Sequence, residues 1–310
     1  MIKKTLYFGN PGYLSMRDEQ LIVKLPEVEK NRELPDSFKQ KNEARIPIED
    51  IGVVVLDNQQ ITVTQGLLDK LLENNTAIIT CNSSRMPAGL LLPLSGNTTQ
   101  RERWHDQIET SVPLKKQLWQ QTVRAKINNQ ATLLKSRTGV NTKNMLYWSD
   151  EVKSGDTENH EARAAVYYWG NIFPTIPYFR RGREDAPPNN LLNYGYAILR
   201  AVVARSLVSS GMLPTLGIHH RNRYNAYCLA DDIMEPFRPY VDNVVIDIVN
   251  SGLDYMELSK DLKQNLLQIP TIDVIIDGER SPLMVGVQRT TASLYKCYSG
   301  ELRKISYPVM

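Results

Sequence analysis

Short runs of apolar and β-branched residues, broken by Gly, Pro, Asn and Asp, fill the first ninety or so residues of the chain. This pattern is typical of β-strands. The runs are KTLYFG (4–9), YLSMRDEQLIVKL (13–25), ARIPIEDIGVVVLD (44–57), QQITVT (59–64) and TAIITCN (76–82). Apolar residues at helical spacing within 63–75 predict one helix among them. The charged stretch 26–45 lacks a clear period, so we expect a loop or a hairpin tip there.

The periodicity becomes helical from about Gln100 onward. Leucines, Val123 and Ile127 recur among basic and amide residues over 100–136, which predicts a long helical segment. Further helices are expected at 160–173, 189–212, 231–252 and around 287–302. A short strand-like piece with a turn at its Asp-Gly step lies at 272–280.

Pro, Gly, Ser and Asn in PLSGNTTQ (93–100) mark a boundary between these two regions. We therefore predict an α+β protein. A small N-terminal β-rich, β-sandwich-like domain occupies 1–95. A larger all-α domain occupies 96–310, and it contains all the candidate catalytic and phosphate-contacting residues discussed below.

Composition narrows the class of protein. The 310 residues are 42% hydrophobic and 23% charged, as in globular domains with a sizeable core. No apolar run approaches the roughly 18–20 residues of a membrane span. The N-terminus has neither an apolar h-region nor a cleavage site, so we expect no secretion. Three widely spaced cysteines fit a reduced, cytoplasmic compartment and argue against a Cys-based zinc site.

Positive charge is concentrated in the middle of the chain. Residues 101–240 hold 19 Lys and Arg against 13 Asp and Glu, whereas the flanking regions are slightly acidic. A basic central region suits a polyanion such as DNA, although an ordinary solvated surface would have the same composition. Seven arginines there are candidate phosphate contacts or, alternatively, surface charges and ion-pair partners. They are Arg180, Arg181, Arg183, Arg200, Arg205, Arg221 and Arg223.

Two carboxylates, Asp232 and Glu235, stand three residues apart among apolar neighbours. On a helix this spacing puts both on one face, and Pro236 is expected to distort the turn. Carboxylates that share a partly buried place repel each other unless a cation neutralises them. Hard oxygen ligands suit Mg²⁺ or Mn²⁺. The alternative interpretation of an isolated D-x-x-E is a solvated helix face.

His219 and His220 are adjacent, so at most one of them is expected to face a given site. A histidine is a metal ligand or a hydrogen-bonded structural residue, and the following RNRY makes the surroundings cationic. Glu161 falls in the first turn of the predicted helix 160–173, where the helix dipole alone would favour it. The sequence lacks the P-loop, the dinucleotide-binding glycine motif, H-E-x-x-H and G-x-S-x-G.

Four motifs come in a fixed order behind the β-rich region: E-x-x-A-A-x-Y-Y from Glu161, L-N-Y-G-Y-A-I-L from Leu192, G-I-H-H from Gly217 and D-D-I-M-E-P-F-R-P from Asp231. In these motifs the chain resembles the CRISPR-associated adaptation integrase and endonuclease family. The segments 118–134 and 216–239 look most like the type II branch of that family. The resemblance covers essentially the whole chain and is most specific over 161–239.

The resemblance implies a site. The metal ligands of the family match Glu161, His220 and Glu235, which would also be the catalytic residues, with Asp232 as a companion carboxylate. The glycine that usually follows the first of these glutamates is replaced by alanine here. Two further residues, Asn193 and Tyr196, match an asparagine–tyrosine pair beside the family's site. An alternative role for the histidine is proton transfer.

The resemblance also implies an activity and partners. The protein would use Mg²⁺ or Mn²⁺ to join the 3′-hydroxyl ends of a short duplex DNA, the prespacer, into the leader end of a CRISPR array by transesterification. It would form a homodimer through the β-rich domains, and two dimers would flank a dimer of the small CRISPR adaptation partner protein. The type II effector nuclease is a further candidate partner, and no membrane is involved.

Three rival interpretations remain open at this point. The first is a non-catalytic, DNA-binding scaffold subunit of the same fold. The second is a stand-alone nuclease that repairs branched DNA, or the integrase of a mobile element, since either would have the same site. The third is an unrelated helical protein in which the D-x-x-E spacing arises by chance.

Overall fold

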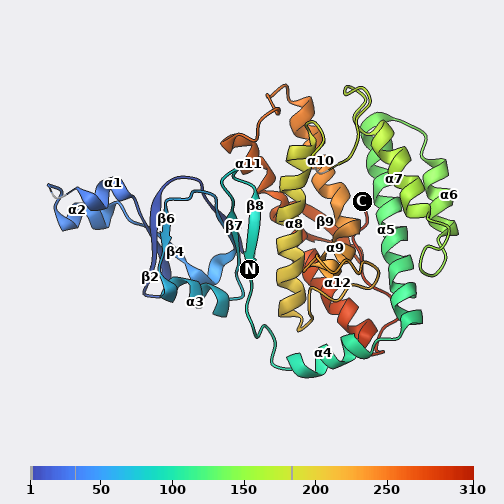
Figure 1. The fold of residues 1–310 in the computed structure, drawn as a ribbon, viewed down its shortest axis with the longest axis horizontal. Coiled ribbons are helices and arrows are strands. Elements are labelled where there is room, and N and C mark those ends of the chain that lie inside the picture. Colours follow the sequence, from blue (N-terminus) through green and yellow to red (C-terminus); the bar gives the residue numbers. More distant parts are fainter. Residues whose placement is uncertain (1–2, 32, 183) are drawn as a thin grey trace. The chain divides into compact units, whose positions relative to one another are not determined.

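The computed structural model describes residues 3–31, 33–182 and 184–310, and these form two compact units, Met1–Leu94 and Ser95–Met310. The domain boundary predicted from the sequence, after residue 95, lies one residue later than the observed one. The first unit is β-rich and the second is mainly helical, which confirms the predicted α+β class (Figure 1). Each unit is described separately below.

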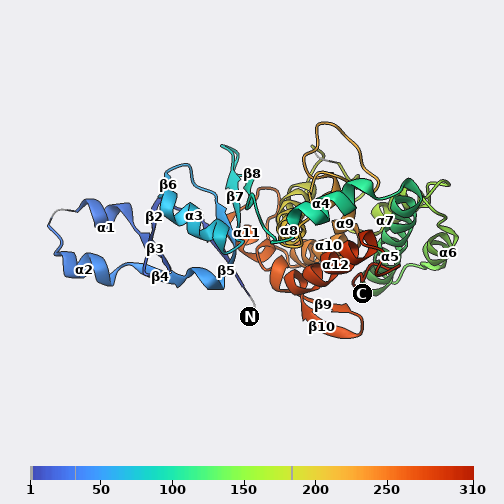
Figure 2. The same cartoon turned by 90° about the horizontal axis from the view of Figure 1, so that it is seen from below.

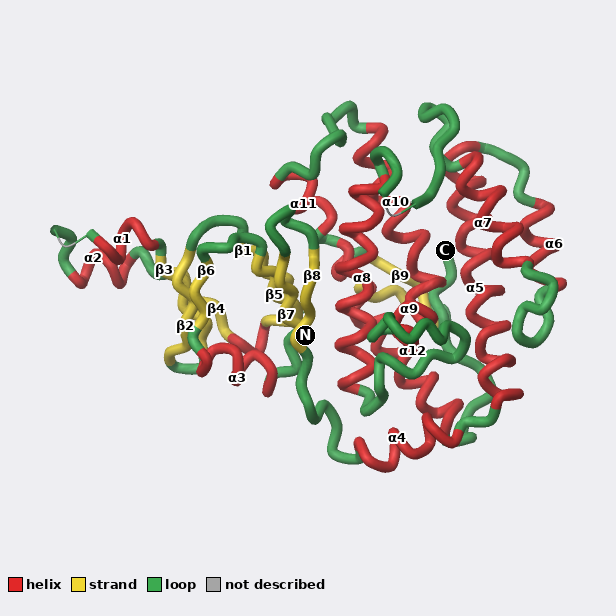
Figure 3. The backbone as a smooth tube through the Cα atoms, viewed as in Figure 1, coloured by secondary structure: helices red, strands yellow, loops and turns green. Residues whose placement is uncertain are grey.

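Eight strands form two four-stranded sheets in the first unit (Figure 3). One sheet has the order β1-β5-β7-β8 and the other the order β4-β3-β2-β6. The strands are β1 (Lys4–Phe8), β2 (Gly12–Arg17), β3 (Gln20–Lys24), β4 (Ala44–Pro47), β5 (Ile51–Leu56), β6 (Ile61–Val63), β7 (Ala77–Cys81) and β8 (Pro87–Leu91). All five predicted strand segments are confirmed, and the predicted helix is α3 (Gln65–Glu73).

One apolar core joins the two sheets of this unit. Its buried residues come from both sheets, from α3 and from the short 3-10 helix η1 (Ile48–Asp50). Leu14 and Leu21 are contributed by one sheet, Val54 and Ile78 by the other, and Leu67 by α3. Inward-facing residues of β2 alternate with more exposed ones, whereas the central strand β5 is buried at five consecutive positions, so it is covered on both faces. The sandwich-like character expected from the sequence is therefore present.

Residues 26–45 connect β3 to its antiparallel partner β4, so the predicted hairpin tip is confirmed, although the tip is not an irregular loop. This stretch contains two short helices, α1 (Pro26–Lys30) and α2 (Asp36–Lys41), before β4 begins. Proline occupies the first turn of α1, where its missing N–H has no helical partner to lose, and acidic residues in that turn favour the helix dipole. Helices this short have too few residues to show an apolar period in the sequence.

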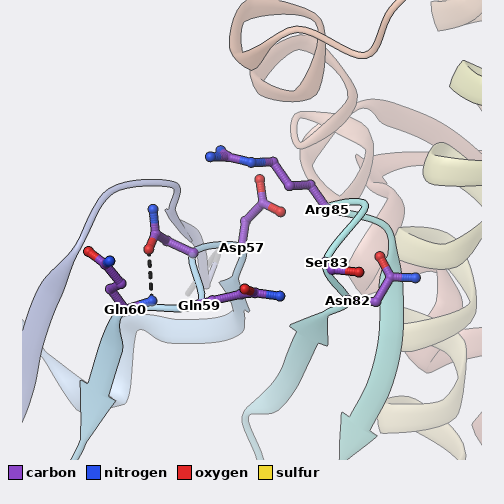
Figure 4. Close-up of a pocket in the computed structure, with 7 residues that line it drawn as sticks. Asp57, Gln59, Gln60, Asn82, Ser83 and Arg85 are labelled. Carbon is purple, nitrogen blue, oxygen red and sulfur yellow. Dashed lines mark hydrogen bonds between the residues drawn. The ribbon is translucent and has the colours of Figure 1, made fainter.

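A polar crevice of about 320 Å³ opens in the β-rich unit where β5 and β7 end (Figure 4). The loop after β5 contributes Asp57 and three amide residues, and the loop after β7 contributes Ser83 and Arg85 among others. The Tyr7 hydroxyl donates a hydrogen bond to the buried Asp57 carboxylate. Burial, together with this bond, raises the pKa of Tyr7. None of the residues predicted to carry chemistry belongs to this unit.

The second unit consists of helices and one β-hairpin. The helices are α4 (Gln100–Glu109), α5 (Val112–Thr138), α6 (Lys143–Glu151), α7 (His160–Asn171), α8 (Asn189–Ser209), α9 (Cys228–Met234), η2 (Glu235–Phe237), α10 (Arg238–Asn250), α11 (Lys260–Leu266), η3 (Ile269–Thr271) and α12 (Leu283–Tyr298). The hairpin consists of β9 (Asp273–Ile276) and β10 (Glu279–Pro282) and packs against α12 (Figure 2).

Helix α8 is the centre of this unit, because most of its residues are buried and none is exposed. It packs against α9, α10, α11 and α12, whereas α5 packs against α6, α7 and η2. Within the described part of the chain, no helix has both the length and the apolar character needed to cross a bilayer.

Two predicted helices are each divided. The segment 100–136 is broken between α4 and α5, where the Ser111 hydroxyl caps α5 by accepting the Leu114 N–H at 3.4 Å. The segment 231–252 is broken at Glu235, where Pro236 lies in the single 3-10 turn η2 between α9 and α10. Proline removes a backbone donor inside a helix, so the second break is the one that the sequence predicts.

Candidate active site

Glu161 and Glu235 come from distant segments and meet at one buried ammonium group. The Lys126 Nζ atom lies 2.6 Å from Glu161 Oε1 and 2.6 Å from Glu235 Oε2. Lys126 belongs to α5, Glu161 to the first turn of α7 and Glu235 to η2. Because α5 packs directly against both α7 and η2, it sets the separation of the two carboxylates. The predicted convergence of these two acids is therefore present in the structure.

Arg238 supplies a second positive charge. Its Nη2 atom lies 3.1 Å from Glu235 Oε1, so that the two oxygens of this carboxylate contact different cations. Burial raises the pKa of Glu235, but Arg238 and Lys126 outweigh burial and lower it overall. Burial lowers the pKa of Lys126, but Glu235 and Glu161 outweigh it and raise the pKa overall. Glu235 and Lys126 therefore stabilise each other in their charged forms.

His220 is held by Asp232. The Nδ1 atom of His220 lies 2.5 Å from Asp232 Oδ1, and the backbone N–H groups of His219 and His220 donate to the same carboxylate at 2.9 and 3.3 Å. Asp232 is fully buried, and its hydrogen bond raises the pKa of His220, with further increases from Glu235 and Glu161. With Nδ1 engaged, Nε2 is the ring atom that can reach a ligand or a substrate.

His219 has a different environment. Its ring stacks on Trp119, with ring centroids 4.1 Å apart and planes 4° from parallel, and burial lowers its pKa. His219 is thus a packing residue and His220 the one near the carboxylates, as the sequence predicted for an adjacent pair. Gly217 makes the turn possible, because a Cβ there would lie 2.4 Å from the His220 carbonyl oxygen and 2.8 Å from Asp232 Oδ2.

The structure does not bring the four predicted metal ligands into one coordination sphere. Among the described residues, no three His, Cys, Asp or Glu side chains are grouped closely enough to hold a metal ion. The Lys126 ammonium lies between the two glutamates, and both oxygens of Asp232 are engaged by the histidine segment. The ligand set Glu161, His220, Glu235 and Asp232 therefore remains a prediction. Its donors, two carboxylates that already hold a cation and one imidazole nitrogen, fit Mg²⁺ or Mn²⁺.

A tyrosine–aspartate network lies behind Arg238. The Tyr196 hydroxyl donates to Asp242 Oδ1 at 2.5 Å, and the Tyr168 hydroxyl donates to Asp242 Oδ2 at 2.8 Å. The guanidinium groups of Arg181 and Arg238 lie over the Tyr196 ring, 5.2 and 4.7 Å from its centroid. Burial raises the pKa of Asp242 to about 6, although the two tyrosines oppose this shift. Tyr196 was predicted to lie beside the site. Its ring contacts the guanidinium group of Arg238, which in turn contacts Glu235.

Asn193 also has a structural partner, because its Oδ1 atom accepts a hydrogen bond from Arg181 Nη2 at 2.8 Å. Sequence reasoning missed Asp242 and Lys126. An acid within the apolar pattern of 238–250 was the available indication for Asp242. Lys126 gave no comparable indication, since a lysine among amide residues is usually solvated.

The candidate phosphate-binding arginines have different environments. Arg180, Arg221 and Arg223 are exposed. Arg200 pairs with Asp231, with Nε 2.6 Å from Oδ1. Arg205 is 4% exposed, so the expectation that it contacts phosphate is wrong, and burial lowers its pKa to about 10. Arg183 lies outside the described residues.

Solved structures that are similar to this chain in fold include Cas1 proteins and a casposase. A casposase bound to its integration product matches 98% of this chain and 92% of its own, with a TM-score of 0.77 and 18% sequence identity. A Cas1 protein from Thermotoga maritima matches 96% of this chain and 98% of its own, with a TM-score of 0.72 and 16% identity.

Comparison of the amino-acid sequence with known proteins identifies the family. The family model "CRISPR associated protein Cas1" matches residues 6–268. A CRISPR-associated endonuclease Cas1 from Neisseria meningitidis serogroup C is 35% identical over 94% of this chain and 91% of its own length. A second relative, from Saccharolobus solfataricus, is 30% identical over 64% of each chain. The chain belongs to the Cas1 family, as its motifs predicted.

Proposed function

We propose that this protein is a metal-dependent DNA endonuclease and integrase of CRISPR adaptation. In this role it joins the 3′-hydroxyl ends of a short duplex DNA to the CRISPR array by transesterification. The observation that carries the proposal is the convergence of Glu161 and Glu235 on one buried cation position beside His220. The relative from Neisseria is named an endonuclease, and the casposase of the same fold was captured with an integration product.

The reaction conserves phosphodiester bonds. The 3′-hydroxyl oxygen of the incoming strand bonds to a phosphorus of the array, and the bond from that phosphorus to the 3′ oxygen of the array strand breaks. A new 3′-hydroxyl leaves with the proton that the attacking hydroxyl has lost. One phosphodiester bond forms for each one that breaks, so no energy cofactor is needed. The barrier arises mainly from charge that develops on the phosphoryl oxygens.

The residues of the chain have distinct tasks in this scheme. Glu161, Glu235 and Nε2 of His220 would hold Mg²⁺ or Mn²⁺, which when bound polarises a phosphoryl oxygen. Asp232 fixes the ring orientation of His220 through Nδ1. Arg238 holds Glu235 in place and is itself supported by Tyr196. The exposed Arg180, Arg221 and Arg223 are candidate contacts to the DNA backbone.

Partners follow from relatives of the same fold. Solved structures include a Cas1–DNA complex and a complex of a Cas6-RT-Cas1 protein with Cas2. We extend these partners to this chain: duplex DNA and a small Cas2-type protein that bridges two homodimers formed through the β-rich units. The type II effector nuclease is retained as a candidate for the selection of prespacers.

The test is covalent transfer of label. The purified chain, its small partner, a 3′-hydroxyl duplex with a 5′ label and a supercoiled plasmid carrying the array are mixed with Mg²⁺ or Mn²⁺. We expect label in the plasmid band with either metal and none after EDTA. A duplex with 3′-dideoxy ends is the matched control and should give no transfer. Transfer that persists in EDTA would refute the metal-dependent mechanism.

Asp232→Asn is expected to weaken Mn²⁺ binding and strand joining by roughly tenfold, since loss of a carboxylate that orients a metal-bound histidine typically costs 10–100-fold. The amide oxygen of asparagine can still accept the His220 Nδ1–H. The amide has no negative charge and only one acceptor oxygen, so it cannot also hold both backbone N–H groups. Asp254→Asn, at an exposed position of the same unit, is the control. The measurement is the Mn²⁺ affinity of the two variants. Equal affinities would show that Asp232 does not orient a metal-bound histidine.

A further inference from the structure

Lys126 is a buried lysine in the position expected of a metal ion. Its side chain is 10% exposed, and its ammonium group contacts one oxygen of Glu161 and one of Glu235. These two residues are the carboxylates that the proposed function assigns as metal ligands. The ammonium is therefore the group that occupies the space between them.

Electrostatics explains why a cation is needed at this position. Two carboxylates that share a partly buried place repel each other and have lost much of their hydration, so the pair is unfavourable when no cation is present. Lys126 neutralises this pair from α5, and Arg238 contacts the remaining oxygen of Glu235. The acids of α7 and η2 are consequently held together by groups of the chain itself.

A divalent ion and this ammonium cannot both occupy the same place. Mg²⁺ requires carboxylate oxygens at about 2.0–2.1 Å, and the ammonium already lies 2.6 Å from an oxygen of each glutamate. Two cations bound between the same pair of oxygens would repel each other strongly in a site with little water. Entry of the metal therefore requires the lysine to leave at least one of its two partners.

We propose that Lys126 is a resident counterion that keeps Glu161 and Glu235 together in the metal-free protein and competes with the divalent ion for them. The inference rests on the proposed function, because it takes the two glutamates as ligands. In this scheme Lys126 is a positioning residue that lowers metal affinity and stabilises the empty site. The chain can thus be folded and ready to bind DNA before the metal arrives.

The experiment measures Mn²⁺ affinity directly, from the loss of the free-ion electron paramagnetic resonance signal during titration of the full chain. Lys126→Met removes the competing charge and keeps an unbranched side chain of similar length, so we expect its Mn²⁺ dissociation constant to be at least about tenfold lower than that of the wild type. Lys135→Met is the matched control, because Lys135 is an exposed lysine of the same helix, and its affinity should equal that of the wild type.

Melting temperature provides a second readout. Without metal, Lys126→Met should melt at a lower temperature than Lys135→Met, and Mn²⁺ should raise its melting temperature more than that of the wild type. Where Lys126→Met does not fold without metal, Lys126→Arg is used. Its guanidinium can bind both carboxylates with two donors each, so its Mn²⁺ affinity should be severalfold weaker than that of the wild type.

The outcomes separate this inference from the proposed function. Unchanged or weaker Mn²⁺ binding by Lys126→Met, combined with loss of binding in Glu235→Gln, would overturn the counterion role and leave the metal site intact. An absence of Mn²⁺ binding in every protein, wild type included, would overturn the proposed function and this inference with it. The inference is supported if Lys126→Met binds Mn²⁺ more tightly than the wild type and no other lysine variant does.

Discussion

Glu235→Gln should lower the rate of strand joining by roughly 10³-fold, equivalent to ~4 kcal/mol of transition-state stabilisation. The substitution removes the charge of the carboxylate that lies between Lys126 and Arg238, while the amide keeps its shape. A neutral amide oxygen is a poor ligand for Mg²⁺ compared with a carboxylate, and the imidazole and Glu161 do not replace it. Initial rates of label transfer into the array plasmid, measured at saturating DNA, give the comparison with the wild type.

Two further variants make this result specific. Glu235 is almost completely buried, so its replacement leaves two cations without their partner and lowers stability as well. Glu161→Gln should reduce joining to a similar degree at a smaller cost in stability, because the Glu161 side chain is 24% exposed. Glu257→Gln, at an exposed position of the same unit, is the control and should join DNA at the wild-type rate. Joining that survives in both site variants would mean that these acids do not hold the catalytic metal.

The sequence was sufficient for the parts of the fold that rest on long periodic segments. Strands β1 to β7 lie in short apolar or β-branched runs, and the helices α3, α7, α8 and α12 carry apolar residues at helical spacing, so each of these elements was found. Strand β8 was missed, since Pro87 and Gly89 disfavour a strand by propensity alone. Its place at the edge of its sheet explains why it tolerates them.

Residues of the candidate site were predictable to different degrees. Glu161, His220 and Glu235 lie in motifs whose spacing resembles that of the family, and the structure brings the two glutamates to one cation. Lys126 was not predictable, because a helical pattern does not reveal that a basic residue faces two acids more than thirty positions away along the chain. Only tertiary packing converts this polar position of α5 into a buried one.

The same reasoning applies to the network around Asp242. The sequence places this acid in an apolar helix but does not supply the two hydroxyl groups that bind it, which come from α7 and α8. These helices carry Glu161 and Tyr196, and Arg238 at the start of α10 reaches back to Glu235. A change in the charge of Asp242 therefore affects a set of helices that together hold the site.

Stability of the wild-type protein should fall as pH rises from about 4 to about 6, relative to Asp242→Asn. Burial raises the pKa of Asp242 to about 6 from 3.8, so in this window the folded protein holds a proton that the unfolded chain has released. Where the native state binds more protons than the unfolded state, unfolding becomes easier as pH rises. The contribution is present below the unfolded pKa and is lost once pH exceeds the folded pKa, with a full size of ~3 kcal/mol.

Urea unfolding at pH 4.5 and 7.5 measures this effect. Between these values the stability difference between wild type and Asp242→Asn should shift by about 2 kcal/mol, with the wild type relatively more stable at pH 4.5. Asp247→Asn is the control on the same helix, because the Asp247 side chain is 57% exposed and pairs with Arg137. Parallel pH profiles for wild type and Asp242→Asn would show that this carboxyl group does not change protonation on folding, and that the tyrosine hydrogen bonds and nearby arginines offset its burial completely.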